Sequence, residues 1–267
     1  MTEIILLRKL YALSAERCRL AFQRMLDSMV AGLEARIKIL GQTERGWVKV
    51  EVQGEDEAVA INQLRRRFGL TPSSLEALKL PCILNGYAID VGKVGYGIYV
   101  DVSLSTPNVV DALIPLHTLR AQLADGGKES MRRIAEVYGI VDNLPLSLRL
   151  TRVDTVARRL EAKLSDAQVS LFEGWVRDGL ERVLAMGVPL EDAEEALRRS
   201  RLERDVVGIE SLGLFEHSFL CKLGTQAPGI IGRLGKYLPG IPLHAYSPYN
   251  IWLKERITLG RQASVGQ

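Results

Sequence analysis

The sequence predicts an α+β protein in which two mixed units flank a short β-rich segment. At the N-terminal end, apolar periods of 2 and 3.6 follow one another in the order strand, helix, strand, strand, helix. The C-terminal end has a similar order, with one extra helix and a final strand. A chain of 267 residues, 47% hydrophobic and 25% charged, is also better divided into two or three domains than built around one core.

The N-terminal unit is predicted over residues 1–70. Its strands alternate apolar and polar residues, and its helices repeat apolar residues with a period of 3.6. Acids open the second helix and arginines close it, which suits the helix dipole. In order, the predicted elements are a strand at 3–11, a helix from Ser14 to Gly32, strands at 35–39 and 47–52, and a helix from Gly54 to Arg67.

A turn-rich stretch around Pro72 leads to the central segment, predicted as a small β-barrel over residues 80–157. Val91–Val102 alternates β-prone residues with glycines, and 146–153 alternates again. One helix is predicted from Glu129 to Tyr138 and is inserted before that last strand. The run Arg159–Leu164 leaves two placements open, since it can close the barrel or begin the C-terminal domain.

The C-terminal domain is predicted over residues 158–250, with a flexible tail at 251–267. Ser165 and Gln168 form a capping-box pattern before a long helix that reaches Gly187. Gly213 is predicted to join two strands as a tight hairpin. Both end units share the split β-α-β-β-α order of a ferredoxin-like fold. The remaining predicted elements are a helix at 189–201, strands at 206–212 and 215–223, a helix at 228–238 and a strand at 242–246.

Charge and composition exclude several classes of protein. The net charge of +3 permits nucleic-acid binding without requiring it. No apolar run reaches 18 residues, and Glu3 is an acid where a signal peptide needs positive charge, so we expect a cytoplasmic protein with no membrane partner. The three cysteines and three histidines share no ligand spacing. We therefore predict no metal, no cofactor and no catalytic residue.

The candidate ligand-binding residues lie in the central segment. Tyr96 and Tyr99 stand beside Gly95 and Gly97, which permit a bulge that would bring both rings out near Lys93. Single-stranded nucleic acid is held by aromatic faces that stack on bases and by cations that follow phosphates. The alternative is that the glycines form turns and the tyrosines are half-buried packing.

The predicted strand Val91–Val102 is followed by a second predicted strand, Asp111–His117. Together they resemble the RNA-binding module first described in the bacterial ribosomal protein S-one. The resemblance covers residues 80–155 and implies an OB-type barrel, a small oligonucleotide-binding fold. It departs from the module at Asp111 and Ala112, where the module has glycine, and at His117, which falls later than the module's histidine. The inserted helix is a further departure.

Other basic residues are candidates for phosphate contacts, each with a structural alternative. Arginines at a helix end also stabilise the helix dipole. The glycine-rich segment 224–236 fails as a Walker loop and is better interpreted as a helix start with small packing residues. These candidates are Arg45, Arg65, Arg66, Lys222, Arg233 and Lys236.

Glu216 and His217 are neighbours inside an alternating strand. Adjacent strand residues face opposite ways, so the pair cannot form a catalytic dyad. We expect His217 to be a hydrogen-bonded histidine on an edge strand rather than a general base.

Several segments together resemble an uncharacterised archaeal family, a domain of unknown function. The resemblance extends over nearly the full length and implies an archaeal cytosolic protein, but it carries no established activity. The segments that carry it are 43–50, 54–60, 91–102, 211–217 and 221–224.

The sequence thus predicts a non-enzymatic RNA-binding protein, acting at the ribosome or another RNA-processing assembly. Two alternatives stay open. The first is a scaffold or dimerising module that pairs through the strand after Gly213. The second is an enzyme that acts on a nucleotide or RNA at the Gly224 loop. The oligomeric state is not predicted.

Overall fold

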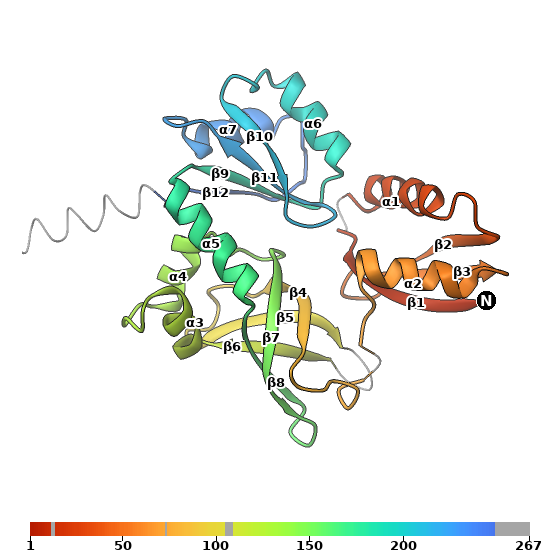
Figure 1. The fold of residues 1–267 in the computed structure, drawn as a ribbon. Helices are drawn as coiled ribbons and strands as arrows, with labels where there is room; N and C mark the ends of the chain where they lie inside the picture. The colour runs from red at the N-terminus through yellow and green to blue at the C-terminus, as the bar shows by residue number, and fades with distance from the viewer. Residues whose placement is uncertain (12–13, 73, 105–108, 249–267) are drawn as a thin grey trace, which may run out of the picture.

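A computed structural model describes residues 1–11, 14–72, 74–104 and 109–248, so the tail predicted at 251–267 lies outside the described residues. Figure 1 shows three units that follow one another along the chain: a sheet with two helices, a barrel, and a second sheet with helices. The predicted α+β class is confirmed, and the central segment is a closed barrel. No helix in the described part of the chain is long and apolar enough to cross a membrane.

The N-terminal unit is an antiparallel sheet of order β1-β3-β2 with two helices on one face. Inward residues of β3, such as Val50, pack against Phe22 of α1 and Leu64 of α2. After α2 the chain returns to the free edge of β1, where Leu7 N donates to Gly69 O at 3.1 Å. The elements are β1 (Thr2–Lys9), α1 (Ala15–Met29), β2 (Ala35–Gln42), β3 (Trp47–Gly54) and α2 (Glu57–Phe68).

The central unit is a five-stranded barrel with the order β4-β5-β6-β8-β7, closed by pairing between β7 and β4. β6 and β8 pair in parallel, and the other neighbours are antiparallel. β8 therefore takes the first of the two placements that the sequence left open. The strands are β4 (Ile83–Ile89), β5 (Gly97–Leu104), β6 (Val110–Pro115), β7 (Pro145–Asp154) and β8 (Arg159–Leu164).

Three helices pack against the barrel: α3 (Leu116–Leu123), α4 (Met131–Tyr138) and α5 (Asp166–Asp178). The sequence analysis predicted α4, which ends at Gly139 in the left-handed conformation, but it missed α3. The strand expected over 111–117 was too long, because β6 ends at Pro115 and His117 lies in the first turn of α3. Leu119 and Leu123, four residues apart, bury the inner side of α3.

The C-terminal unit is an antiparallel sheet of order β10-β11-β9-β12. The prediction that this helix reaches Gly187 was wrong, since α5 ends at Asp178, before Gly179, and a strand follows. All five residues of that strand are buried, Arg182 included, and a run that is buried throughout has no period that separates strand from helix. The elements are β9 (Arg182–Met186), α6 (Leu190–Arg199), β10 (Val206–Ser211), β11 (Glu216–Cys221), α7 (Ala227–Leu234) and β12 (Leu243–Tyr246).

Both faces of the C-terminal sheet are covered. One face packs on α6 and α7, and the other joins the barrel core, where the Tyr246 ring lies 5.6 Å from that of Trp175 in α5. The strand after Gly213, expected to be exposed for pairing, is β11 and lies between β10 and β9. A partner could not add to it without displacing one of them.

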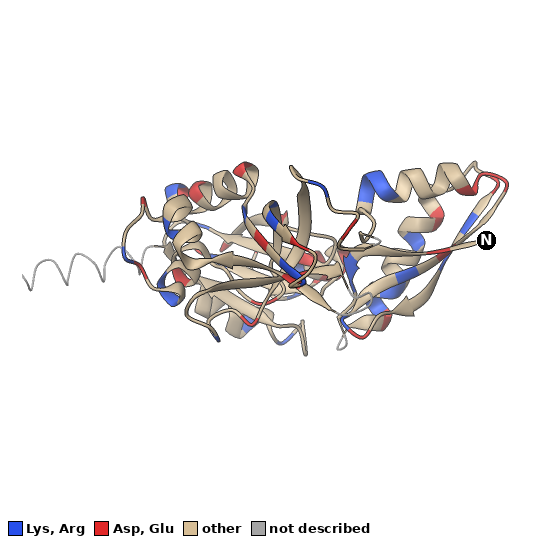
Figure 2. Cartoon of the chain, turned by 90° about the horizontal axis from the view of Figure 1, so that it is seen from below, with Lys and Arg blue, Asp and Glu red and all other residues tan. Residues whose placement is uncertain are grey.

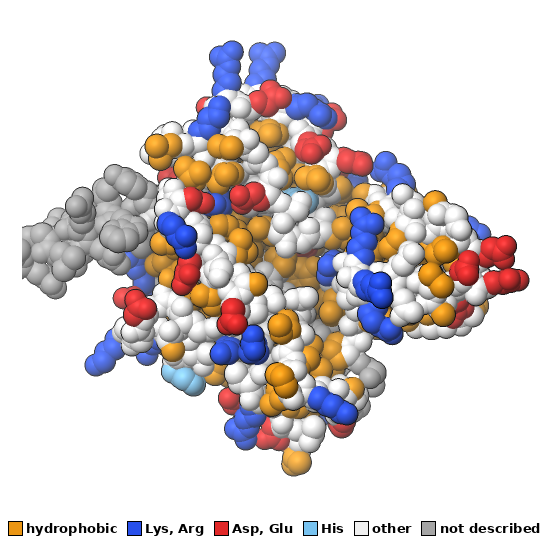
Figure 3. Space-filling view, viewed as in Figure 1, with side chains coloured by type: hydrophobic (Ala, Val, Ile, Leu, Met, Phe, Trp, Pro, Cys, Tyr) orange, Lys and Arg blue, Asp and Glu red, His pale blue; other side chains and the backbone are white. Residues whose placement is uncertain are grey.

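The three units meet around a cavity of about 220 Å³, lined by residues such as Leu7, Tyr87 and Leu212 from the three units in turn. In the space-filling view, hydrophobic side chains line the hollow at this junction (Figure 3). The N-terminal sheet differs from the C-terminal one, because its outer face is covered by the barrel only at one end, around Lys9 and Trp47.

Candidate nucleic-acid interface

Tyr96 and Tyr99 form a pair on the outer surface of the barrel. Their hydroxyl oxygens are 2.9 Å apart, and their ring centroids are 6.1 Å apart with the planes at 88°. Tyr96 is 55% exposed. The two rings meet because Tyr96 lies in the loop before β5 while Tyr99 points outward from the strand. The expected bulge lies elsewhere, since the register of β5 against β6 shifts between Val100 and Leu104.

The two glycines beside the pair have different roles. A Cβ atom on Gly97 would lie 2.4 Å from the backbone oxygen of Ile114, so β5 and β6 approach too closely there for any side chain. A Cβ atom on Gly95 would have nothing within 4 Å. Gly97 is thus required for the close pairing of β5 and β6 beside Tyr99, while Gly95 belongs to the loop.

Two cations lie near the tyrosine pair. Lys93 Nζ is 2.5 Å from Asp90 Oδ1 at the surface, and this contact raises the pKa of Lys93. Arg159, at the start of β8, is exposed and has no ion pair among the described residues. The hydrogen bond with Tyr96 raises the pKa of Tyr99, whereas the nearby guanidinium of Arg159 lowers it. The sequence analysis did not single out Arg159, because it left undecided whether the strand that begins there belongs to the barrel or to the C-terminal domain.

Arg45 joins two domains instead of standing free. It lies in the turn between β2 and β3, and its Nη1 is 2.7 Å from Asp111 Oδ1 while its Nε is 3.3 Å from Asp101 Oδ2. Burial raises the pKa of Asp111, against the opposing effect of Arg45. With two carboxylates already on its guanidinium, Arg45 positions the N-terminal sheet against the barrel beside the tyrosine pair.

Behind Arg45 lies a buried polar network that the sequence analysis missed. Lys9 is 7% exposed and Asp101 0%, and Lys9 Nζ is 2.7 Å from Asp101 Oδ2. The same carboxylate accepts from Trp47 Nε1 at 3.1 Å and from Ser103 N at 3.0 Å. Lys9 also lies 5.0 Å from the Trp47 ring centroid. The signal in the sequence was weak, because Lys9 follows a second cation, Arg8, in the same strand.

The other predicted phosphate contacts do not join this surface. Arg65 and Arg66 lie on α2, where Arg65 Nη1 donates to Asn62 Oδ1 at 2.9 Å. Lys222, Arg233 and Lys236 belong to the C-terminal unit. Figure 2 shows Lys and Arg distributed over all three units. Of the basic residues named so far, Arg159 is the one whose charge acts on Tyr99. Lys93 precedes Tyr96 by three residues, and Arg45 binds Asp111 on the strand next to β5.

The glycine-rich segment after Gly224 has the structure of a helix start. Ala227 N, at the beginning of α7, donates to Glu181 Oε2 at 2.7 Å. Arg233 is bound to Asp205 Oδ2 at 3.1 Å and to the backbone oxygen of Ser200 at 2.8 Å. A carboxylate thus already occupies the place where a phosphate would bind, which favours the structural alternative here.

Glu216 and His217 face opposite sides of β11, as expected. His217 Nε2 lies 3.0 Å from the oxygen of Val188, but β11 is an internal strand and His217 is not at an edge. The hydroxyl of Tyr11 donates to Glu216 Oε1 at 2.5 Å. Desolvation raises the pKa of Glu216 to about 7 and lowers that of His217 to about 4. Neither group has the other in reach, so no dyad forms.

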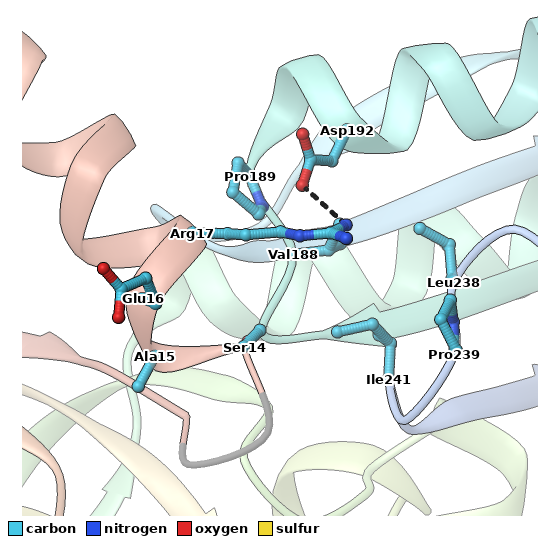
Figure 4. Close-up of a pocket in the computed structure, with 10 residues that line it drawn as sticks. All are labelled: Ser14, Ala15, Glu16, Arg17, Val188, Pro189, Asp192, Leu238, Pro239 and Ile241. Atoms are coloured by element: carbon cyan, nitrogen blue, oxygen red, sulfur yellow. Dashed lines mark ion pairs between the residues drawn. The ribbon is translucent and has the colours of Figure 1, made fainter.

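A cavity of about 460 Å³ lies between the start of α1 and the C-terminal unit (Figure 4). Arg17 extends across it to Asp192 at 3.5 Å, and much of the remaining lining is apolar, including Leu238 and Ile241. One cation with its own carboxylate does not make a set of convergent catalytic groups. In the described part of the chain, no group of three or more His, Cys, Asp or Glu residues could hold a metal ion.

These features define a class: an α+β protein of three units, built on a closed five-stranded barrel whose outer surface carries one exposed and one partly exposed tyrosine in contact. The chain belongs to the DUF2110 family. Its residues 3–74 match the DUF2110 N-terminal domain, 82–176 the central domain and 180–244 the C-terminal domain. Among curated proteins, none matches the chain.

Proposed function

We propose that this protein binds single-stranded RNA on the outer face of its barrel. The observation that carries the proposal is the surface pair of Tyr96, which is exposed in the loop before β5, and Tyr99, which is partly exposed on β5. Unpaired bases stack on exposed aromatic rings, whereas the bases of a duplex are already stacked on one another. Arg159 and Lys93 add positive charge next to the rings.

The topology of the barrel supports an OB-type assignment. Counted along the barrel, its strands follow the order 1-2-3-5-4, and the third and fifth form the parallel pair. OB folds bind their ligands on the face of strands 2 and 3 and with the loops 1–2 and 4–5. Here these are β5, β6 and the loops at 90–96 and 155–158. Tyr96, Tyr99 and Arg159 lie in or next to those parts.

The flanking units fit the same proposal. The C-terminal β-α-β-β-α-β order, with the sheet order β10-β11-β9-β12, supports a ferredoxin-like assignment, and the N-terminal unit follows that order without a fourth strand. We place the protein in the cytoplasm of an archaeon, at the ribosome or another RNA-processing assembly. That context rests on the two sequence resemblances.

The test is a titration of fluorescently labelled oligouridylate against the protein, stripped of nucleic acid at high salt. We expect binding that is micromolar or tighter and weakens with salt. Tyr96→Ala/Tyr99→Ala should weaken it by roughly tenfold or more, because stacking contributes about 1–3 kcal/mol per base. Tyr237→Ala is the matched control, since Tyr237 is partly exposed on the C-terminal unit beside Arg199. Absence of binding, or equal losses in both variants, rejects the proposal.

A further inference from the structure

We propose that a single strand of RNA bound at the tyrosine pair continues through the groove between the barrel and the N-terminal sheet, onto the open outer face of that sheet. This inference rests on the proposed function and deepens it. It makes the ligand an extended single strand that spans two domains, rather than a few nucleotides on the barrel alone.

The first step is the groove. A cavity of about 360 Å³ separates residues 43–49 of the N-terminal unit from Asp101, Ser103 and Leu104 of β5. Arg45 lies in its lining and also contacts Asp111 on β6. Asp111 lies two residues from Leu113, the residue of β6 that pairs with Tyr99, so Asp111 and Tyr99 share the outer face of neighbouring strands. The groove therefore begins beside the tyrosine face.

The second step is the open sheet face. Alternate residues of β2 and β3 point away from the helices, and on this side Arg36, Lys38 and Lys49 are exposed. None of the three has an ion pair within the described residues. Lys49 lines both the groove and a second cavity of about 400 Å³ along β1. The cations thus continue from the groove along the sheet.

Acids share this face, and their positions matter. Glu51 on β3 is opposite Lys38 on one side and Glu3 of β1 on the other. Arg36 and Lys38 lie on β2, and Lys49 lies nearest the barrel on β3. Glu51 lies level with Lys38 on β3, and Glu3 lies on β1. One further acid, Glu44 in the turn between β2 and β3, is exposed and lines the groove. A phosphate backbone that follows β2 and the barrel end of β3 meets mostly positive charge.

A purely structural role does not account for all of these cations. Lysine on an edge strand prevents pairing with other chains, which explains Lys38 on β2. Lys49, however, lies on β3 between β1 and β2, where no edge needs protection. An exposed lysine that contacts a phosphate releases a counterion, and this gives it a function in binding.

The test compares labelled oligouridylates of 4, 8 and 16 nucleotides. The variant is Lys38→Gln/Lys49→Gln, and the control with the same change of charge is Lys128→Gln/Arg204→Gln, whose cations are exposed on other units. For wild type we expect affinity to rise with length. The variant should match wild type at 4 nucleotides, lose roughly tenfold at 16, and lower the salt slope by about 1.4, or about 0.7 per phosphate contact. The control should follow wild type.

Three outcomes overturn the inference. The variant can keep the full gain in affinity with RNA length. It can also lose as much affinity at 4 nucleotides as at 16, which would mean that its lower net charge weakens binding everywhere. Excess polyglutamate of matched charge can also abolish the gain in affinity with length without displacing the 4-nucleotide strand. The proposed function is tested separately by Tyr96→Ala/Tyr99→Ala on the 4-nucleotide strand and survives all three outcomes. Only a wild type that binds no length of RNA overturns both.

Discussion

The Lys9 ammonium group lies 2.7 Å from the Asp101 carboxylate, with both side chains almost fully buried between β1 and β5. This contact fixes the N-terminal sheet against the barrel. It holds Arg45 and the groove in place beside the tyrosine pair, because Arg45 binds the same carboxylate.

We predict that Lys9→Met lowers the free energy of unfolding by about 3–5 kcal/mol, because it leaves the Asp101 charge buried with less compensation. Lys9→Met/Asp101→Asn should recover part of that loss, since the amide oxygen can still accept from Trp47 and Ser103. Urea unfolding followed by tryptophan fluorescence measures both. A loss below about 1 kcal/mol in the single variant would mean that the pair does not stabilise the interface.

Glu216 and His217 are predicted to make opposite contributions to the pH dependence of stability. The pKa of Glu216 rises from 4.5 to about 7 on folding, so between these values the folded state holds a proton that the unfolded state has lost, and stability falls as pH rises. The pKa of His217 falls from 6.5 to about 4 on folding. Its contribution to stability therefore rises as the pH rises from 4 to 6.5. Each contribution is on the order of 3 kcal/mol, and the two largely cancel between pH 4.5 and 6.5.

Replacing either residue should reveal the contribution that the other makes to the pH dependence of stability. Glu216→Gln should become more stable from pH 4 to 6.5, and His217→Gln should become less stable from pH 4.5 to 7. Urea midpoints measured across this range provide the test. If both variants keep the wild-type profile, the two groups do not change protonation on folding.

Gly97→Ala is predicted to destabilise the barrel by about 1–3 kcal/mol, the range for forcing atoms into packed space. Its new Cβ atom would lie 2.4 Å from the Ile114 oxygen, so β5 and β6 must separate. Gly95→Ala is the matched control and should be nearly neutral, because its Cβ atom meets nothing within 4 Å. Thermal unfolding of the two variants distinguishes them, and equal melting temperatures would contradict the close approach.

Arg159→Gln is predicted to weaken RNA binding and to lower the salt slope by about 0.7, the loss of one phosphate contact on a single strand. Arg204→Gln, an exposed arginine on the C-terminal unit, is the control. Anisotropy titrations at several salt concentrations measure the slope. An unchanged slope in Arg159→Gln would remove this residue from the binding face.

Part of the candidate site could be predicted from the sequence. The glycines beside Tyr96 and Tyr99 predicted a bulge that would bring both rings out. The hydroxyls do meet, but they meet because Tyr96 lies in the loop before β5, and Tyr99 is only partly exposed. Arg159 and Lys49 were missed, since a charged residue at an outward strand position looks the same whether it faces solvent or a ligand. Arg45 was expected to contact phosphate, but Asp101 and Asp111 are its partners.

The capping box at Ser165 shows where local patterns end. Gln168 N donates to Ser165 Oγ at 3.2 Å, as the pattern predicts. The Gln168 side chain, however, accepts from Ser147 N at 3.1 Å instead of returning to Ser165. A side chain can accept from any donor that the fold brings within hydrogen-bond distance, and only some of these donors are neighbours in sequence.

The sequence by itself determined the elements whose signals lie within a few residues of one another. These include the alternating strands at 35–39 and 47–52 and the helix that ends at Gly139. Only the tertiary structure decided that 182–186 is a strand, that β8 closes the barrel, and that Lys9 meets Asp101. The physical reason is the range of the interactions: side-chain periodicity and helix caps act between near neighbours, whereas strand pairing and buried ion pairs depend on residues that are far apart in the chain.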